Sequence, residues 1–158
     1  CTKKRSQKLR FFALFDIRKI RHVLVTHRHS DHFSEESLRL LTASGAKFVE
    51  FAAGETKKIG RYTVRATEAN HPTCNPTVHF LIDDGEKRIF YGLDGAWLLY
   101  SEVAAIKEKH VDLAVFDATI GNKKGDYRIF EHNNLKMIIE QKEALEKTIA
   151  ELGESVEV

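Results

Sequence analysis

The segment that decides the fold is residues 25–33, which read Val25-Thr26-His27-Arg28-His29-Ser30-Asp31-His32-Phe33. It places three imidazoles and one carboxylate within six consecutive positions. These side chains offer the nitrogen and oxygen ligands that zinc, iron and manganese accept. In an extended backbone His27 and His29 point the same way and could bind one ion, while Asp31 and His32 follow where the chain turns and could face a second ion.

The residues on either side predict that this segment is a loop between a strand and a helix. Residues 22–26 form a short β-rich run suited to a buried strand. Residues 34–43 predict a helix with acidic residues in its first turn, and Gly45 fits its C-terminal cap. A His-rich surface loop is the alternative interpretation, and the position directly after a buried strand argues against it.

Residues 27–32, HRHSDH, are similar to the HxHxDH signature of the metallo-β-lactamase superfamily. The resemblance implies an α/β fold of four αββα layers with a mono- or dinuclear metal site at one edge of two sheets. It also implies strands ahead of the motif, which the preceding residues can barely supply. We therefore expect a single domain over residues 1–158. Compared with the family, either a segment is missing or the fold is a trimmed version.

The composition excludes several classes of protein. The 158 residues suit one domain with its own core, and the formal net charge of +2 does not require a nucleic-acid partner. The basic run over residues 2–10 is typical of a solvated tail. Neither a membrane-spanning apolar run nor a signal-peptide pattern is present, so a cytoplasmic location is the default, and two cysteines make no disulfide framework.

The rest of the chain alternates strand-like and helix-like segments, which favours a layered α/β fold. Asp84-Gly85 predicts a tight hairpin turn. Asn133 or Asn134 could cap the last helix. The loop 119–128 is rich in Gly and Lys and should be mobile. Strands are predicted at 47–51, 61–67, 77–82, 87–92 and 111–117 (the last of them buried), with a further strand starting at 156–158, and helices at 97–109 and about 135–152.

Two further metal ligands are predicted from the resemblance. His71 lies in a turn after a strand, and a lone His in such a loop is more often merely exposed. In the superfamily, however, a third His follows a strand, and a hairpin then leads to an Asp that bridges two metals. The resemblance therefore implies that His27, His29 and His71 hold the first ion and that Asp31, His32 and Asp94 hold the second, with Asp94 bridging.

The ligand set of the second ion is incomplete, because a final His ligand of the family has no counterpart before Val158. Two divalent ions, zinc or manganese with iron also suited, would lower the pKa of a shared water so that hydroxide becomes available as a nucleophile. Asp31 could orient this hydroxide. His132, just before the last helix, matches a His that the phosphodiesterase branch uses to contact phosphate or protonate a leaving group, although a helix-capping or surface role is its alternative.

The predicted function is a metal-dependent phosphodiesterase acting on a small cyclic phosphate or nucleotide-like ester. The order of Asn70-His71, the hairpin and Asp94 resembles the branch of the phosphoribosyl cyclic phosphate phosphodiesterase and the tRNA 3′-endonucleases. An RNA-processing nuclease is one alternative, which the short basic loop does not favour. A non-catalytic metal-binding scaffold is the other. The predicted partner is thus a small phosphodiester. Nucleic acid is less favoured as a partner, and no membrane partner is predicted. The sequence leaves the oligomeric state open.

Overall fold

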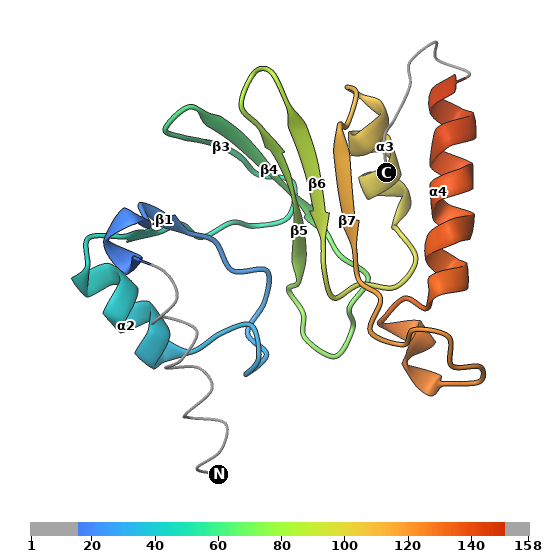
Figure 1. Cartoon of the computed structure of the whole chain (residues 1–158), viewed down its shortest axis with the longest axis horizontal. Coiled ribbons are helices and arrows are strands. Elements are labelled where there is room, and N and C mark those ends of the chain that lie inside the picture. Colours follow the sequence, from blue (N-terminus) through green and yellow to red (C-terminus); the bar gives the residue numbers. More distant parts are fainter. Residues whose placement is uncertain (1–15, 151–158) are drawn as a thin grey trace. The chain divides into compact units, whose positions relative to one another are not determined.

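The computed structural model describes residues 16–150, which fall into two compact units, one ending at Glu50 and the other beginning at Phe51 (Figure 1). The predicted tail at 2–10, the predicted strand at 156–158 and the end of the last predicted helix lie outside the described residues. None of the helices within residues 16–150 combines the length and apolar character needed to cross a membrane.

The first unit holds the HRHSDH segment between a small sheet and a helix. Its elements are η1 (Ile17–Lys19), β1 (His22–Val23), α2 (Glu35–Ala43) and β2 (Lys47–Phe48). β1 and β2 pair in parallel, as the connection through a helix requires. The predicted strand at 22–26 is confirmed only at its start, and its residues are half-buried, whereas the sequence predicted a buried strand. The predicted strand at 47–51 is likewise confirmed only at its first two residues.

Helix α2 begins and ends where the sequence predicts. The hydroxyl of Ser34 accepts a hydrogen bond from the backbone N–H of Ser37, which satisfies one of the donors at the helix start. Gly45 follows the last turn with φ of +99°, a left-handed conformation that glycine adopts without steric cost. These two local signals fix how far the helix extends from the preceding loop.

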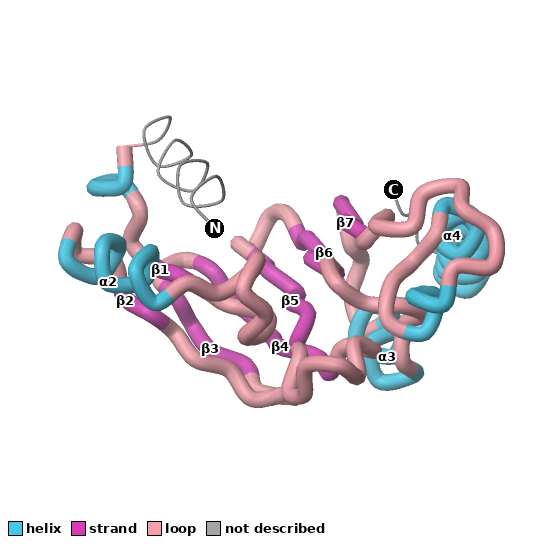
Figure 2. The backbone as a smooth tube through the Cα atoms, turned by 90° about the horizontal axis from the view of Figure 1, so that it is seen from below, coloured by secondary structure: helices cyan, strands magenta, loops and turns pink. Residues whose placement is uncertain are grey.

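The second unit is built on a five-stranded sheet in the order β3-β4-β5-β6-β7 (Figures 1 and 2). β3 to β6 pair antiparallel, and β6 pairs parallel with β7. The predicted hairpin is confirmed as β5 and β6. The strands are β3 (Thr56–Ile59), β4 (Tyr62–Glu68), β5 (Val78–Asp83), β6 (Arg88–Gly92) and β7 (Leu113–Phe116).

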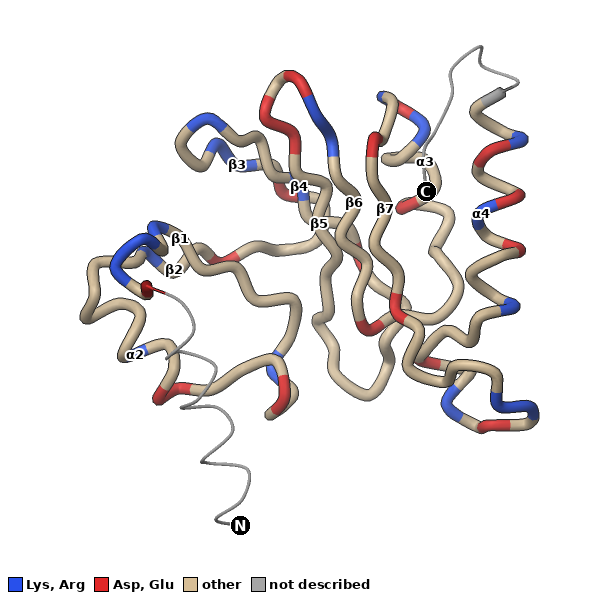
Figure 3. Tube along the Cα trace, viewed as in Figure 1, with Lys and Arg blue, Asp and Glu red and all other residues tan. Residues whose placement is uncertain are grey.

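Two helices, α3 (Tyr100–Lys107) and α4 (Leu135–Ala150), pack with this sheet around one apolar core. The core joins side chains of β5, β6, both helices and the turn before β7: Leu81, Phe90, Ala105, Ile106, Val111, Leu145 and Ile149. Both Lys and Glu occur along α4 (Figure 3), and they form the ion pairs Lys136–Glu140 at 3.4 Å and Lys142–Glu146 at 2.5 Å.

One strand of the second unit was missed, and two predictions for this unit need correction. β3 was not predicted, because its sequence TKKI alternates weakly and is dominated by lysine. β7 was predicted to be buried, but it is an edge strand with Leu113 45% exposed. The loop 119–128 contains the start of the short 3-10 helix η2 (Tyr127–Phe130), where the Asp126 carboxylate accepts a hydrogen bond from the backbone N–H of Arg128.

The connection β6-α3-β7 has the consequence that matters most for the site. Gly92 pairs with Phe116, so the two parallel strands end side by side. Residues that follow them, including Asp94 and Asp117, therefore emerge at the same edge of the sheet.

Candidate metal centre

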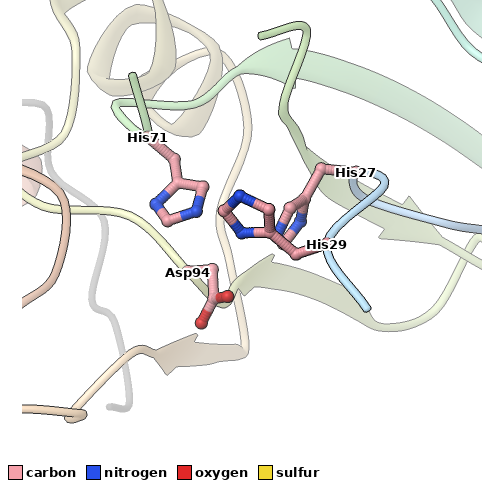
Figure 4. A group of neighbouring side chains, drawn as sticks. All are labelled: His27, His29, His71 and Asp94. Carbon is pink, nitrogen blue, oxygen red and sulfur yellow. The ribbon is translucent and has the colours of Figure 1, made fainter. Parts of the chain in front are cut away.

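In the first unit the HRHSDH segment gathers three imidazole rings. The ring centroid of His27 lies 4.7 Å from that of His29 and 4.4 Å from that of His32. Figure 4 shows the rings of His27 and His29 projecting from the same segment. The chain turns after His29, whose carbonyl accepts hydrogen bonds from the backbone N–H groups of His32 at 3.0 Å and Phe33 at 2.7 Å. This turn brings the predicted donors of one loop together, as the sequence indicates.

The orientation of His27 and the ionised state of Asp31 suit a cation. The Nδ1 atom of His27 lies 2.9 Å from the hydroxyl of Thr26, so Nε2 is the ring nitrogen that an ion would take. Partial burial alone would raise the pKa of the Asp31 carboxyl, but a hydrogen bond from its own backbone N–H and the charges of the neighbouring His side chains outweigh this effect. The pKa of Asp31 consequently lies below its ordinary value, which keeps the carboxylate ionised.

In the second unit His71 and Asp94 lie on the loops that follow β4 and β6 (Figure 4). The Nδ1 atom of His71 is 3.1 Å from the backbone carbonyl of Glu131, and a ring held in this way directs Nε2 outward as a ligand. Asp94 has φ of +57°, a left-handed conformation that is uncommon outside glycine and that Asp tolerates better than most residues. Both side chains are therefore held in defined positions by their loops.

A further carboxylate, Asp117, completes a cluster that the sequence did not predict. Asp94, Asp117 and His132 each offer a ligand atom, and these atoms lie within 4.8 Å of one another. The Nδ1 atom of His132 is 2.7 Å from the Asp117 carboxylate and 3.8 Å from that of Asp94. Asp117 is in turn fixed by the backbone N–H of Thr119 at 2.7 Å. His132 is thus a ring oriented by a buried carboxylate.

A second polar network holds the Asp94 loop from the side of α4. The amide nitrogen of Asn133 donates to the carbonyls of Gly95 at 2.8 Å and Ala96 at 3.2 Å. The Asn133 side-chain oxygen accepts from Gln141 at 3.0 Å, and the Gln141 oxygen accepts from the backbone N–H of Leu98 at 2.8 Å. Asn133 is therefore a loop clamp, whereas Asn134 is the helix cap, through a bond of 2.9 Å from the backbone N–H of Met137.

The remaining histidines of the described residues are outside these clusters. His22 opens β1, and His110 lies 4.0 Å from the Asp112 carboxylate near the surface. His79 is buried in β5 and contacts Glu102. A cavity of about 180 Å³ also adjoins His71, between the end of β4, the loop that follows it and Leu99.

Comparisons with known proteins support the fold. No protein-family model matches the sequence, and no curated protein matches it significantly. CmlA, a diiron β-hydroxylase from Streptomyces venezuelae, aligns with a TM-score of 0.58 at 21% identity over 85% of this chain and 35% of its own. YhfI from Bacillus subtilis, a metallo-β-lactamase fold protein, aligns with a TM-score of 0.60 at 16% identity over 78% of this chain and 60% of its own.

A third similar structure is Igni18, a metallo hydrolase from the archaeon Ignicoccus hospitalis, with a TM-score of 0.56 at 16% identity over 87% of this chain and 75% of its own. The chain thus spans 35% of CmlA and 60% of YhfI. Similarity at these identities concerns the fold. The second unit holds a cluster of Asp94, Asp117 and His132 that could bind a divalent ion, and the first unit gathers three imidazole rings. The chain has an α/β fold of the metallo-β-lactamase type.

Proposed function

We propose that the protein is a metal-dependent hydrolase, and that its substrate is a small phosphodiester such as a cyclic phosphate or nucleotide-like ester. The observation that carries the proposal is the cluster of Asp94, Asp117 and His132. It combines a candidate bridging carboxylate with a ring whose Nδ1 is bonded to a second, buried carboxylate at 2.7 Å. Such a pairing suits a ring that transfers a proton to a leaving group.

The proposed ligands are those that the HxHxDH resemblance implies. His27, His29 and His71 would hold one ion; Asp31, His32 and Asp94 would hold the other. The donors fit a divalent cation because they combine neutral imidazole nitrogens with carboxylate oxygens, a mixture that suits zinc, manganese and iron alike.

When bound, divalent ions lower the pKa of a water molecule towards neutrality and so supply the nucleophile. The chain's own residues would do the rest. Asp31, whose carboxyl has a lowered pKa, would accept a hydrogen bond from the attacking water and orient it. His132 would donate a proton to the departing oxygen from Nε2, because Nδ1 is engaged by Asp117.

A diester assay with a metal series tests this function. The chain is stripped with a chelator, then supplied with zinc, manganese or ferrous iron, and hydrolysis of bis(p-nitrophenyl) phosphate is followed by released nitrophenolate. Ferrous iron belongs in the series because CmlA is described as a diiron enzyme. We expect turnover with at least one metal and none in the stripped protein.

Two His variants sharpen this assay. His132→Ala should lose most of the turnover while retaining its metal. His110→Ala is the matched control, since its ring lies near the surface outside the described clusters. Absence of turnover under all three metals would refute the phosphodiesterase proposal, and equal turnover of the two variants would refute the role of His132.

A further inference from the structure

His79, on the buried strand β5, contacts one of the loops described above. Its ring is only 2% exposed, and its Nδ1 lies 2.7 Å from a carboxylate oxygen of Glu102. Glu102 itself is completely buried in the first turn of α3. A buried carboxylate needs hydrogen bonds to offset its desolvation, so this pair is not incidental packing.

The position of the His79 ring is fixed through Glu102. One carboxylate oxygen of Glu102 also accepts from the Thr67 hydroxyl at 3.4 Å, and the other accepts from the backbone N–H of Leu99 at 2.9 Å. The ring of Phe90 packs edge-to-face against His79 with centroids 5.7 Å apart. These contacts come from β4, α3 and β6, and they leave the imidazole little freedom to rotate.

The opposite edge of the imidazole lies directly against Gly95, the residue after Asp94. A Cβ atom on Gly95 would sit 2.5 Å from Cε1 and 2.8 Å from Nε2 of His79, closer than real Cβ contacts. Gly95 does not have a positive φ, so this glycine is required by the close approach of the ring and not by its backbone conformation. Moreover, Nε2 of His79 is buried without a hydrogen-bond partner, so no hydrogen bond from this atom explains why the ring lies against Gly95.

We propose that His79 and Glu102 are positioning residues that set the location of the Asp94 carboxylate. The inference rests on the proposed function in that Asp94 is taken as a metal ligand. Asp94 occupies a left-handed conformation that the surroundings must maintain. The His79 ring supports the adjoining Gly95 from the sheet, and Asn133 holds the Gly95 carbonyl from the side of α4 at 2.8 Å.

A double-mutant cycle tests the contact without any metal. His79→Asn keeps an N–H donor near the position of Nδ1, so Glu102 stays bonded, but it removes the ring edge beside Gly95. Gly95→Ala adds the Cβ atom that the ring excludes. We expect Gly95→Ala to lower the Tm of the stripped protein, and the double variant to have a higher Tm than Gly95→Ala alone, because the new methyl group fills the vacated space. Strictly additive shifts in Tm would overturn the contact.

A spectroscopic measurement tests whether the contact positions Asp94. Cobalt(II) is titrated into the stripped protein, and its visible absorption reports ligand geometry. His79→Asn should change this spectrum and weaken cobalt binding by about 10- to 100-fold, the range typical of residues that orient ligands. Adding Gly95→Ala should restore part of the wild-type spectrum.

Leu81→Ala is the matched control for this titration, since Leu81 is equally buried two residues along β5 and packs into the core. It should lower the Tm and leave the spectrum unchanged. A His79→Asn spectrum and affinity identical to wild type would overturn the inference. Failure of the wild-type chain to bind cobalt would overturn the proposed function, while the double-mutant cycle would still decide whether His79 and Gly95 are coupled.

Discussion

Replacement of Asp117 by Asn is the perturbation that isolates the orientation of His132. The substitution preserves the shape of the side chain and its ability to accept a hydrogen bond from the backbone N–H of Thr119, which lies 2.7 Å from the Asp117 carboxylate in the wild-type protein. It removes the negative charge that lies 2.7 Å from Nδ1 of His132. The change therefore tests one charged hydrogen bond inside a cluster that otherwise stays intact.

The expected loss follows from the strength of that bond. A hydrogen bond to a charged group contributes about 1.5–3 kcal/mol, and each 1.4 kcal/mol corresponds to a factor of ten in rate. If the Asp117–His132 hydrogen bond contributes this free energy only in the transition state of proton transfer to the leaving group, kcat should fall by about 10- to 150-fold. KM should change little, because Asp117 is only 3% exposed and is proposed to act through His132.

The assay is the steady-state hydrolysis of bis(p-nitrophenyl) phosphate by wild type and Asp117→Asn, with the metal content of both proteins measured in parallel. We expect equal metal content and a lower kcat. A kcat within twofold of wild type, in conditions where His132→Ala is impaired, would refute the orienting role. Loss of an ion from Asp117→Asn would instead identify Asp117 as a ligand.

Three further predictions address the metal, the core and the surface charges. His29→Ala should lose bound metal and diester hydrolysis together, as measured by elemental analysis and turnover; a variant that keeps both would refute its role as a ligand. Phe90→Ala should lower the free energy of unfolding in urea by about 3–5 kcal/mol, because its fully buried side chain leaves a cavity in the core. The hydrogen bond from Lys87 and then the backbone N–H of Arg88 hold the pKa of the Asp112 carboxyl below its ordinary value. Its contribution to stability is therefore present above about pH 4 and lost as pH falls through the folded-state pKa, so Asp112→Asn should be less stable than wild type at pH 7, with the difference shrinking in acid unfolding curves.

Elements with local signals were predictable from the sequence. α2 has its cap at Ser34 and its terminating glycine at Gly45, and the hairpin of β5 and β6 has its Asp-Gly turn. The ligand donors of the HRHSDH segment could also be predicted from the sequence, because they lie in one short loop that turns at the end of a strand. In each case the information lies within a few residues of the feature.

The features that were missed depend on contacts between distant parts of the chain. Asp117 was read only as the end of a strand, and its meeting with Asp94 depends on the parallel pairing of β6 with β7. A signal was present, since a carboxylate at the end of a predicted strand is a candidate for a site at the edge of a sheet. The contacts of His79 with Glu102 and Gly95 could not be inferred from its place in a hairpin strand.

The number of divalent ions that the chain retains tests the proposed metal centre most directly. Protein purified in the presence of zinc or manganese is dialysed against metal-free buffer, and the ions per chain are counted by elemental analysis for wild type and for His71→Ala. Wild type should retain two ions, and His71→Ala should retain fewer. Retention of no ion by wild type, or an unchanged count in His71→Ala, would contradict the proposed metal centre.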